Sequence, residues 1–297
     1  MNAHHCALVL ATLAAAVAIR GGAAMQSGAA GSTSKEWPAV GGDGGNARYS
    51  TLAEITTSNV TKLGAAWTAR LDNTVSSRAM AVVKDGMIFV TATPSVYAFD
   101  AKTGAQVWRF QTGGGRGQAP TGMGAPAREG VAVAEGMVFV GLSDARVIAL
   151  NEKTGQLVWN KYFGDNPRDK GQVASGAPMY AAGLVSIGLS ADNGWRGQVV
   201  AFDPKTGNEA WRFHVIPAPA EKGHETWPQN SQVWQRGGGA VWLVGAAEPD
   251  QNTVYYVTGN GVPQLSGKVP PGDNLYLCSV VALDAKSGKL KWHYQGG

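Results

Sequence analysis

Cysteine is nearly absent from the sequence, which contains only Cys6 and Cys278 among 297 residues. Cys6 lies in an apolar segment at the N-terminus that resembles a leader, so we expect no internal disulfide in the mature chain. No Cys-x-x-Cys-His motif is present, which excludes a c-type haem attachment site from this sequence. We expect Cys278 to lie in a strand as a small buried hydrophobic residue, with a reactive thiol as the alternative.

Charge is also scarce, because Asp, Glu, Lys and Arg make up 15% of the residues and the formal net charge is +4. The basic residues are spread along the chain without a Lys/Arg run, so nucleic acid is not an expected partner. The mild basicity is consistent with attraction of an anionic ligand and equally with ordinary surface lysines.

Several catalytic and metal-binding signatures are missing. The five histidines show no metal-ligand spacing, which argues against a zinc site. No Gly-x-Ser-x-Gly motif is present, which argues against a hydrolase nucleophile of that kind. The glycine-rich residues 113–117 are followed by neither a helix pattern nor a Lys-Ser/Thr pair, so we interpret them as a flexible loop and not a phosphate loop.

Long hydrophobic runs are limited to the N-terminus, where residues 6–19 are apolar and residues 22–24 are small. This pattern predicts a secretory signal peptide over residues 1–24, a flexible segment over 25–36 and a periplasmic mature chain. A wrongly assigned start and an uncleaved anchor are the alternatives, because residues 1–5 contain no Lys or Arg. No later stretch is apolar over the roughly 20 residues that a membrane span requires.

Glycine and tryptophan are abundant, with 41 and 10 residues, which is typical of all-β proteins rich in tight turns. The pattern Ala-x-Asp/Asn-x-x-Thr/Ser-Gly-x-x-x-Trp occurs four times. The copies start at Ala98, Ala149, Ala201 and Ala282 and end at Trp108, Trp159, Trp211 and Trp292.

Each copy predicts a β-hairpin. The glycine supplies a positive φ at the turn, the preceding Asp or Asn can bond turn amides, and the tryptophan presents a large flat face. Ahead of three copies lies another pair of strand signals, such as residues 81–84 and 87–90. The repeating unit is therefore predicted to be a four-stranded antiparallel sheet.

The copies begin 51, 52 and 81 residues apart, and four-stranded units of about 40 to 50 residues are typical of β-propeller blades. We predict an all-β fold, a β-propeller in which each repeat Trp lies over the small Ala and the turn of the neighbouring blade. An open β-solenoid or a sandwich is the alternative. The extra sequence of the longest interval, residues 215–239, predicts a long loop on a functional face.

Further motifs accompany the repeats: Trp37-Pro38, Arg48-Tyr49-Ser50, Gly194-Trp195-Arg196-Gly197, Arg236-Gly237-Gly238-Gly239, Thr258-Gly259-Asn260 and Pro271-Gly272-Asp273-Asn274. In this order they resemble the alcohol and methanol dehydrogenases that depend on pyrroloquinoline quinone (PQQ). The resemblance covers residues 37–297. It implies an incomplete propeller domain, about half of an eight-bladed ring around a quinone site.

The resemblance implies PQQ and Ca²⁺ as cofactors, with a lanthanide as the alternative metal. In this family the quinone lies on a Trp ring, and Trp242, which follows the triple glycine, matches that position. Ser175 stands where relatives have a threonine that bonds the quinone, and it keeps the hydroxyl donor. Core packing for Trp242 and an ordinary loop position for Ser175 are the alternatives.

Two residues match the metal ligands of the family. Asn260 aligns with an amide ligand, and Asp192 stands where the family usually has a glutamate. Aspartate is also a hard oxygen donor but is one methylene shorter, so the loop must shift inward or hold the metal more weakly. For both residues an ordinary turn role is the alternative.

The sequence departs from the family at several positions. Met123-Gly124 stands where many relatives have adjacent cysteines, so their strained disulfide cannot form. Arg78 stands where a glutamate often faces the quinone, and with Arg128 it is expected to contact the anionic cofactor. The catalytic aspartate of relatives is expected beyond Gly297, so no catalytic residue is expected within the chain.

The resemblance implies a quinoprotein alcohol dehydrogenase, which oxidises an alcohol to an aldehyde by hydride transfer to metal-bound PQQ and passes electrons to an acceptor such as a c-type cytochrome. Because an unclosed propeller exposes two apolar blade faces, we expect a truncated product, a fragment or one part of a larger assembly. The alternative function is a non-catalytic propeller scaffold of the bacterial envelope, which would not need Asp192, Trp242 and Asn260 together.

Overall fold

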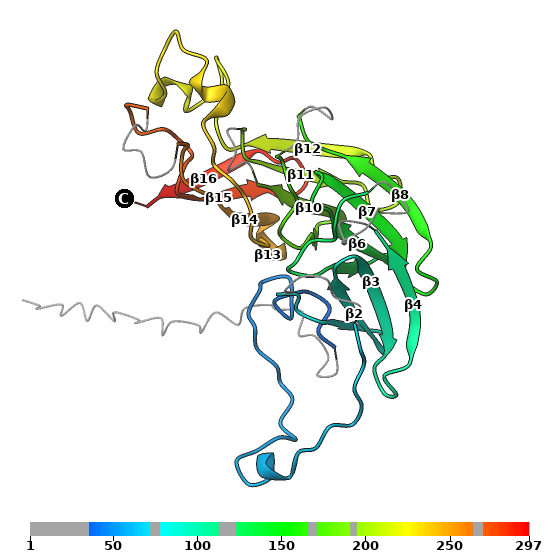
Figure 1. Ribbon diagram of the computed structural model, residues 1–297. Coiled ribbons are helices and arrows are strands. Elements are labelled where there is room, and N and C mark those ends of the chain that lie inside the picture. The colour runs from blue at the N-terminus through cyan, green and yellow to red at the C-terminus, as the bar shows by residue number, and fades with distance from the viewer. Residues whose placement is uncertain are drawn as a thin grey trace, which may run out of the picture.

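The structure, a computed structural model, describes residues 36–71, 78–112, 123–165, 171–190, 195–263 and 270–296. Four four-stranded antiparallel sheets follow one another around an arc (Figure 1). Each sheet uses four strands that are consecutive in sequence, as propeller blades do, so the predicted fold is confirmed. The predicted signal peptide lies outside the described residues. Within them, no helix has the length and apolar character needed to cross a membrane.

The strands divide evenly among four blades. Blade 1 contains β1 (Val82–Lys84), β2 (Met87–Ala92), β3 (Ser95–Asp100) and β4 (Gln106–Gln111). Blade 2 contains β5 (Ala132–Ala134), β6 (Met137–Gly141), β7 (Arg146–Asn151) and β8 (Leu157–Tyr162). Blade 3 contains β9 (Met179–Ala181), β10 (Leu184–Leu189), β11 (Gln198–Phe202) and β12 (Glu209–His214). Blade 4 contains β13 (Ala246–Glu248), β14 (Thr253–Val257), β15 (Ser279–Asp284) and β16 (Leu290–Gln295). The described helices are short 3₁₀ turns: η1 (Val60–Lys62), η2 (His224–Thr226), η3 (Val233–Arg236) and η4 (Pro249–Gln251).

The turn between the third and fourth strands of each blade is built by its Asp or Asn. Asp100 Oδ1 accepts hydrogen bonds from the backbone N–H groups of Lys102 and Thr103, at 3.1 and 2.7 Å, and from the Thr103 hydroxyl at 2.7 Å. The bonds from Thr103 lower the pKa of Asp100. Gly104 then adopts a φ of +73°, which glycine reaches without steric cost. The turns of the other blades repeat this arrangement with Asn151, Asp203 and Asp284.

The tryptophans that end the first three repeats pack on the turn of the next blade. Trp108 Nε1 donates to the Glu152 carbonyl oxygen at 2.8 Å. A Cβ atom on Gly155 would come within 2.7 Å of the Trp108 ring, so the turn glycine also admits the indole. In the strand register, Ala98 lies opposite Trp108 of its own blade. The same interblade bond joins Trp159 to the Pro204 carbonyl (2.7 Å) and Trp211 to the Ala285 carbonyl (3.0 Å).

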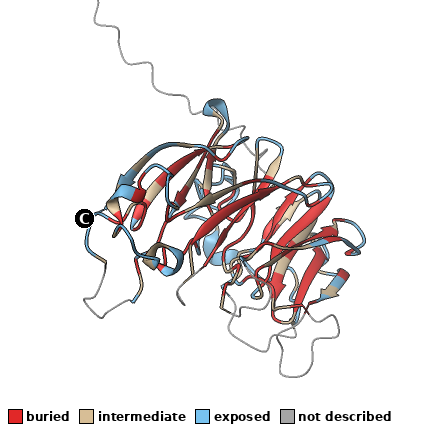
Figure 2. Cartoon of the chain, turned by 90° about the horizontal axis from the view of Figure 1, so that it is seen from above, coloured by how far each residue is buried: buried red, intermediate tan, exposed pale blue. Residues whose placement is uncertain are grey.

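These tryptophans connect the cores of adjacent blades. Trp108 is the one buried residue of the outer strand β4, whereas every residue of β6 and β11 is buried. Figure 2 shows that burial is concentrated along the strands. The Trp108 ring lies 5.9 Å from Phe89 of its own blade, and the Trp159 ring contacts both Phe139 and Phe202, at 5.8 and 6.4 Å between centroids. Aromatic contacts therefore run across the blade boundaries.

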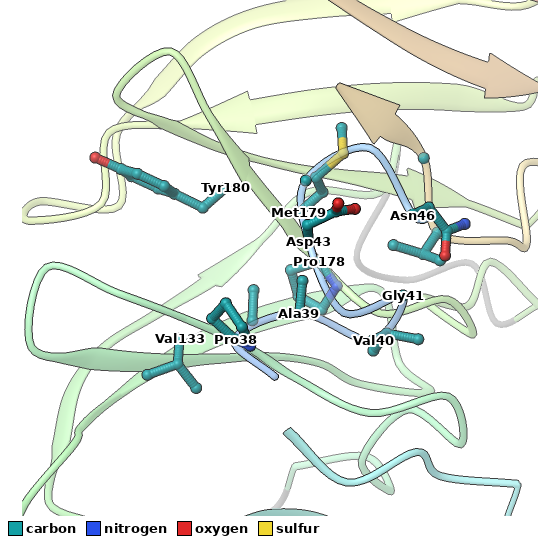
Figure 3. Close-up of a pocket in the computed structure, with 14 residues that line it drawn as sticks. Pro38, Ala39, Val40, Gly41, Asp43, Asn46, Val133, Pro178, Met179 and Tyr180 are labelled. Atoms are coloured by element: carbon teal, nitrogen blue, oxygen red, sulfur yellow. The ribbon is translucent and has the colours of Figure 1, made fainter. Parts of the chain in front are cut away.

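Residues 37–47 form a strap between the first and last described blades. Trp37 and Val83 of β1 exchange two backbone hydrogen bonds of 2.8 Å, and Ala247 of β13 donates its N–H to the Gly44 carbonyl at 2.7 Å. Beneath the strap lies a cavity of about 170 Å³. Figure 3 shows Val40 of the strap and Val133 and Met179 of blades 2 and 3 among its lining residues.

The predicted loop over residues 215–239 contains η2 and η3 and is anchored to blades 3 and 4. Trp227 is 2% exposed and its Nε1 donates to the Leu275 carbonyl at 2.5 Å. The Arg196 guanidinium lies over the Trp234 ring at 4.9 Å from its centroid. The insertion is therefore packed through its aromatic side chains.

The prediction for Cys278 is wrong. Cys278 is exposed and precedes β15 instead of lying within a strand. Its φ is +48°, in the left-handed region, where it closes the turn over residues 275–278. The apolar residues on both sides of the cysteine concealed this turn.

Blade 3 ends in a mostly buried histidine, His214, surrounded by charged side chains. Burial, followed by the charge of Arg196, lowers the pKa of His214 to about 4; Arg212 acts in the same direction, and Asp165 and Glu221 oppose it. The imidazole is therefore neutral in the folded protein at neutral pH.

Replacing Trp159 by alanine should lower the free energy of unfolding by about 3–5 kcal/mol, because a buried aromatic and its interblade hydrogen bond are lost. The control is Trp292→Ala, since Trp292 has the same place in its repeat but is 48% exposed. That change should cost less than about 1 kcal/mol. Urea unfolding followed by circular dichroism measures both, and equal losses would contradict the docking role.

The depressed pKa of His214 predicts a loss of stability in acid. The unfolded state binds the proton near pH 6.5 and the folded state only near pH 4, so the contribution of His214 is complete above the first value and lost toward the second. The amount is about 3 kcal/mol at most. Unfolding free energies at pH 7.5 and pH 4.5 should therefore differ less in His214→Gln than in the unaltered protein. An identical difference would refute the assignment.

Candidate functional site

Three of the residues predicted to bind the cofactor line one cavity of about 370 Å³. Arg78 precedes β1, Arg128 precedes β5 and Ser175 precedes β9, so each belongs to the segment that enters the first strand of its blade. The first strands of neighbouring blades approach one another, which brings these distant parts of the sequence together. The remaining wall is formed by Thr93, Ala125, Pro126, Ala127, Ser143, Val173 and Ala174.

Hydrogen bonds to the backbone hold this wall in place. The Thr91 hydroxyl donates to the Ala127 carbonyl at 2.8 Å, and the Ala125 N–H donates to the Ser143 hydroxyl at 2.8 Å. The side chain of Arg128 follows directly and is exposed toward solvent, as is that of Arg78. The cavity therefore combines a fixed polar rim with two guanidinium groups that remain accessible to an anion.

The Ser175 hydroxyl is the least satisfied group of the cavity. Its Oγ is buried and has no hydrogen-bond partner among the described residues. Leaving a buried hydroxyl unpaired costs about 1–3 kcal/mol, so a ligand that bonds it gains affinity. This is an arrangement suited to a planar anion with carbonyl or carboxylate oxygens.

Trp242 and Asn260 line a second cavity, of about 440 Å³, at the end of blade 4. Trp242 is 39% exposed, and a Cβ atom on Gly259 would come within 2.6 Å of its ring, so the glycine lets the indole approach the strand end closely. Unlike the docking tryptophans, Trp242 is absent from the buried clusters of the described residues. Its exposed face is open to a ligand.

Glycines before Trp242 determine its position. Gly238 and Gly239 have φ values of +93° and +76°, and a Cβ atom on Gly197 would lie 1.6 Å from the Gly239 carbonyl oxygen. Side chains at these positions would be strained or would clash with backbone. The triple-glycine motif thus lets the chain pass close to blade 3 before Trp242.

The predicted metal ligands are only partly described. Asn260 is exposed at the end of blade 4, where its Nδ2 donates to the Gly261 carbonyl at 2.9 Å. Asp192 lies outside the described residues. In the ranges that the structure covers, no group of three His, Cys, Asp or Glu side chains could hold a metal ion. The metal site remains a prediction.

The segments that carry Ser175 and Trp242 approach each other at Gly176. A Cβ atom there would lie 2.9 Å from the Trp242 carbonyl oxygen and 3.1 Å from the Leu243 carbonyl carbon. The backbone next to Ser175 therefore touches the backbone of Trp242. The structure gathers Arg78, Arg128 and Ser175 in one cavity and places Trp242 and Asn260 in its neighbour.

Sequence reasoning missed Glu129, which follows the wall of the first cavity. Burial raises the pKa of the Glu129 carboxyl, while backbone hydrogen bonds from Val244 and Ala177 and the charge of Arg78 lower it. Burying part of a carboxylate where several blades meet is unusual, because removing a charged group from water costs free energy. Its only signal in the sequence is a charged residue between Arg128 and a glycine.

Residues 37–296 match the PQQ family described as glucose/ethanol/alcohol dehydrogenase, beta-propeller domain. Among curated proteins, the quinohemoprotein alcohol dehydrogenase of Comamonas testosteroni is 38% identical over 275 residues, which are 88% of this chain and 39% of that protein. The dehydrogenase subunit of the alcohol dehydrogenase (quinone) of Gluconobacter oxydans is 35% identical and is matched over 37% of its length. The chain thus spans about two fifths of the length of these relatives.

Solved structures agree with this relationship. The crystal structure of the Comamonas testosteroni quinohemoprotein superposes with a TM-score of 0.80 at 36% identity, over 90% of this chain and 42% of that one. A europium-containing methanol dehydrogenase superposes with a TM-score of 0.76 at 27% identity, over 89% of this chain and 49% of that one. By sequence and by the arrangement of its blades, the chain belongs to the family of PQQ-dependent alcohol dehydrogenases.

Proposed function

We propose that this chain forms part of the cofactor site of a quinoprotein alcohol dehydrogenase that oxidises an alcohol to an aldehyde. The observation that carries the proposal is the buried, unpartnered Ser175 hydroxyl in one cavity with the Arg78 and Arg128 guanidinium groups. When bound, PQQ with its metal supplies a polarised carbonyl that accepts hydride from the alcohol.

The residues of the first cavity fit the charged edge of this cofactor. PQQ is a planar quinone that bears several carboxylates, and guanidinium groups bind carboxylates in a bidentate manner. Arg78 and Arg128 would neutralise these groups, and the Ser175 hydroxyl would donate to one oxygen. The exposed Trp242 face would exclude water from one side of the ring system.

The metal would be held by oxygen ligands. The amide oxygen of Asn260 and the carboxylate of Asp192 are hard donors of the kind that Ca²⁺ and lanthanides require. A europium-containing enzyme is among the related structures, so either metal is compatible with the family. Asp192 is the ligand assigned from the sequence alone.

The activity of the whole protein extends beyond the described cavities. We assign no general base among their residues. A periplasmic location, reached through the signal peptide over residues 1–24, and an acceptor such as a c-type cytochrome complete the proposal. Relatives described as quinohemoproteins suit such an electron acceptor.

Titration with PQQ tests the cofactor proposal directly. Added PQQ should quench the tryptophan fluorescence of the purified chain saturably in the presence of Ca²⁺. Arg78→Ala should weaken PQQ binding by about tenfold or more, because one charge-assisted contact is lost. Trp242→Ala should remove most of the quenching. Trp292→Ala is the matched control, since Trp292 is exposed and lines neither cavity.

A folded chain that does not bind PQQ would refute this proposal and favour the envelope scaffold. Binding that survives both Arg78→Ala and Trp242→Ala would place the cofactor elsewhere on the molecule.

Substitution of Ser175 should separate stability from binding. Ser175→Ala removes an unpaired buried hydroxyl, so the free energy of unfolding without ligand should stay equal or rise by about 1 kcal/mol. PQQ affinity should fall about five- to tenfold. Ser175→Thr keeps the hydroxyl and serves as the control. A destabilised alanine variant with unchanged affinity would show that Ser175 is a structural residue.

A further inference from the structure

The turn between β6 and β7 contacts two walls of the first cavity. One is the blade 3 wall, residues 173–175, which carries the unpartnered hydroxyl. The Leu142 carbonyl oxygen of the turn accepts the Ala174 N–H of this wall at 3.1 Å. A Cβ atom on Gly141, the last residue of β6, would lie 3.0 Å from the Ala174 Cβ atom. The β6–β7 turn therefore lies close against the blade 3 wall.

The same turn holds the blade 2 wall, residues 124–128. The Gly124 N–H donates to Asp144 Oδ2 at 2.8 Å, and the Ala125 N–H donates to the Ser143 hydroxyl at 2.8 Å. The Ser143 N–H donates in return to the Ala125 carbonyl oxygen at 2.8 Å. Two consecutive side chains of the turn thus accept two consecutive N–H groups of the wall. Ala125 and Ser143 line the cavity, whereas Asp144 is not among its lining residues.

The Asp144 carboxylate acts through one of its two oxygens. Arg146 Nη1 donates to Asp144 Oδ2 at 2.6 Å, so the oxygen that accepts the Gly124 N–H also receives a charge-assisted bond. Asp144 Oδ1 is buried and has no hydrogen-bond partner among the described residues. A side chain with a single acceptor oxygen at this position could therefore keep the bond to Gly124.

Gly124 lies too close to the turn to carry a side chain. A Cβ atom there would lie 2.8 Å from the Asp144 backbone nitrogen and 2.8 Å from the Ser143 hydroxyl oxygen. Met123, which precedes the wall, is 8% exposed and belongs to a buried cluster. This close approach accounts for a glycine at a position where the sequence departs from its family.

Further along, the blade 2 wall is tied to strands of two blades. The Ala127 N–H donates to the Gly141 carbonyl oxygen at 2.7 Å, and the Ala127 carbonyl oxygen accepts the Thr91 hydroxyl at 2.8 Å. The Asp144 bond at Gly124 is the first in this row of bonds. Its loss should loosen the start of the wall while Ala127 stays in place.

We propose that Asp144 is a positioning residue, whose carboxylate holds the start of the blade 2 wall on the β6–β7 turn and so sets its spacing from Ser175 across the cavity. This inference rests on the proposed cofactor function and deepens it. Because the turn bonds Ala174 as well as Gly124 and Ala125, it determines how far apart the two walls stand. Asp144 does not touch the ligand; it acts through the walls that a planar anion would contact.

The test compares Asp144→Ala with Asp203→Ala. Asp203 also accepts backbone N–H groups, from Lys205 and Thr206 at 3.0 and 2.8 Å, but it belongs to the turn between β11 and β12 and lines none of the three cavities. Hydrogen exchange resolved by NMR should be about tenfold faster or more at Gly124 in Asp144→Ala and unchanged there in the control. PQQ affinity should fall about five- to tenfold in Asp144→Ala alone.

A conservative variant separates the hydrogen bond from the ion pair. The amide oxygen of Asp144→Asn can accept the Gly124 N–H, so this variant should restore slow exchange at Gly124 and most of the PQQ affinity. An ion pair with Arg146 would not be restored by a neutral amide. An asparagine variant that behaves like the alanine variant would overturn the proposal.

A double-mutant cycle separates positioning from general destabilisation. If Asp144 sets the spacing between the blade 2 wall and Ser175, then Asp144→Ala should weaken PQQ binding much less in a Ser175→Ala background than in the unaltered protein. Additive losses would contradict the positioning role.

The inference and the proposed function can fail separately. A folded, unaltered chain that does not bind PQQ refutes the cofactor function, and the ligand part of the inference falls with it. Normal PQQ binding by the unaltered chain, with the same affinity in Asp144→Ala, refutes the inference alone. Should Asp144→Ala not fold, Gly124→Ala disturbs the same bond from the wall, because its Cβ atom would meet the Asp144 backbone nitrogen. It should show the same loss of PQQ affinity, and an unchanged affinity would refute the inference.

Discussion

Every boundary between the described blades depends on an indole that lies on the glycine turn of the next blade. The indole N–H satisfies a turn carbonyl, and the absent Cβ of the glycine makes room for the ring, as Trp108 does at Gly155. The Asp or Asn of each repeat holds that turn in the shape the indole requires. The turn within a blade and the packing between blades thus depend on the same residues. This explains why the repeat keeps its spacing between the turn and the Trp.

The site follows from this spacing. Because the blades are held at constant separation, their entry segments meet along the inner side of the arc, where Arg78, Arg128 and Ser175 come together although almost 100 residues separate the first from the last. The inner strands of the blades are mostly apolar and contribute little chemistry, as β5 and β6 show. The residues proposed to bind the cofactor belong to the segments before β1, β5 and β9 and to the glycine-rich approach to Trp242.

The inner side of the arc is also where the chain departs from the most stable arrangement. Ser175 buries a hydroxyl without a partner, and Glu129 buries part of a charge. In the repeat turns, by contrast, the Asp or Asn oxygen is bonded by donors two or three residues later, as at Asp100 and Asp203. Locally unfavourable arrangements of this kind are typical of binding sites, because a bound ligand can supply the hydrogen bond or opposite charge that the folded chain lacks.

The sequence alone determined the blades, since the hairpin, its turn and its terminal Trp are encoded within eleven consecutive residues of each repeat. The family motifs also named Trp242, Asn260, Ser175 and the two arginines without a structure. Only the tertiary structure decided that these residues divide between two cavities and that Cys278 is exposed in a turn. Local patterns fix backbone conformation, because turns and strands are short-range. Burial and the convergence of distant segments arise when blades pack, and no local pattern records them.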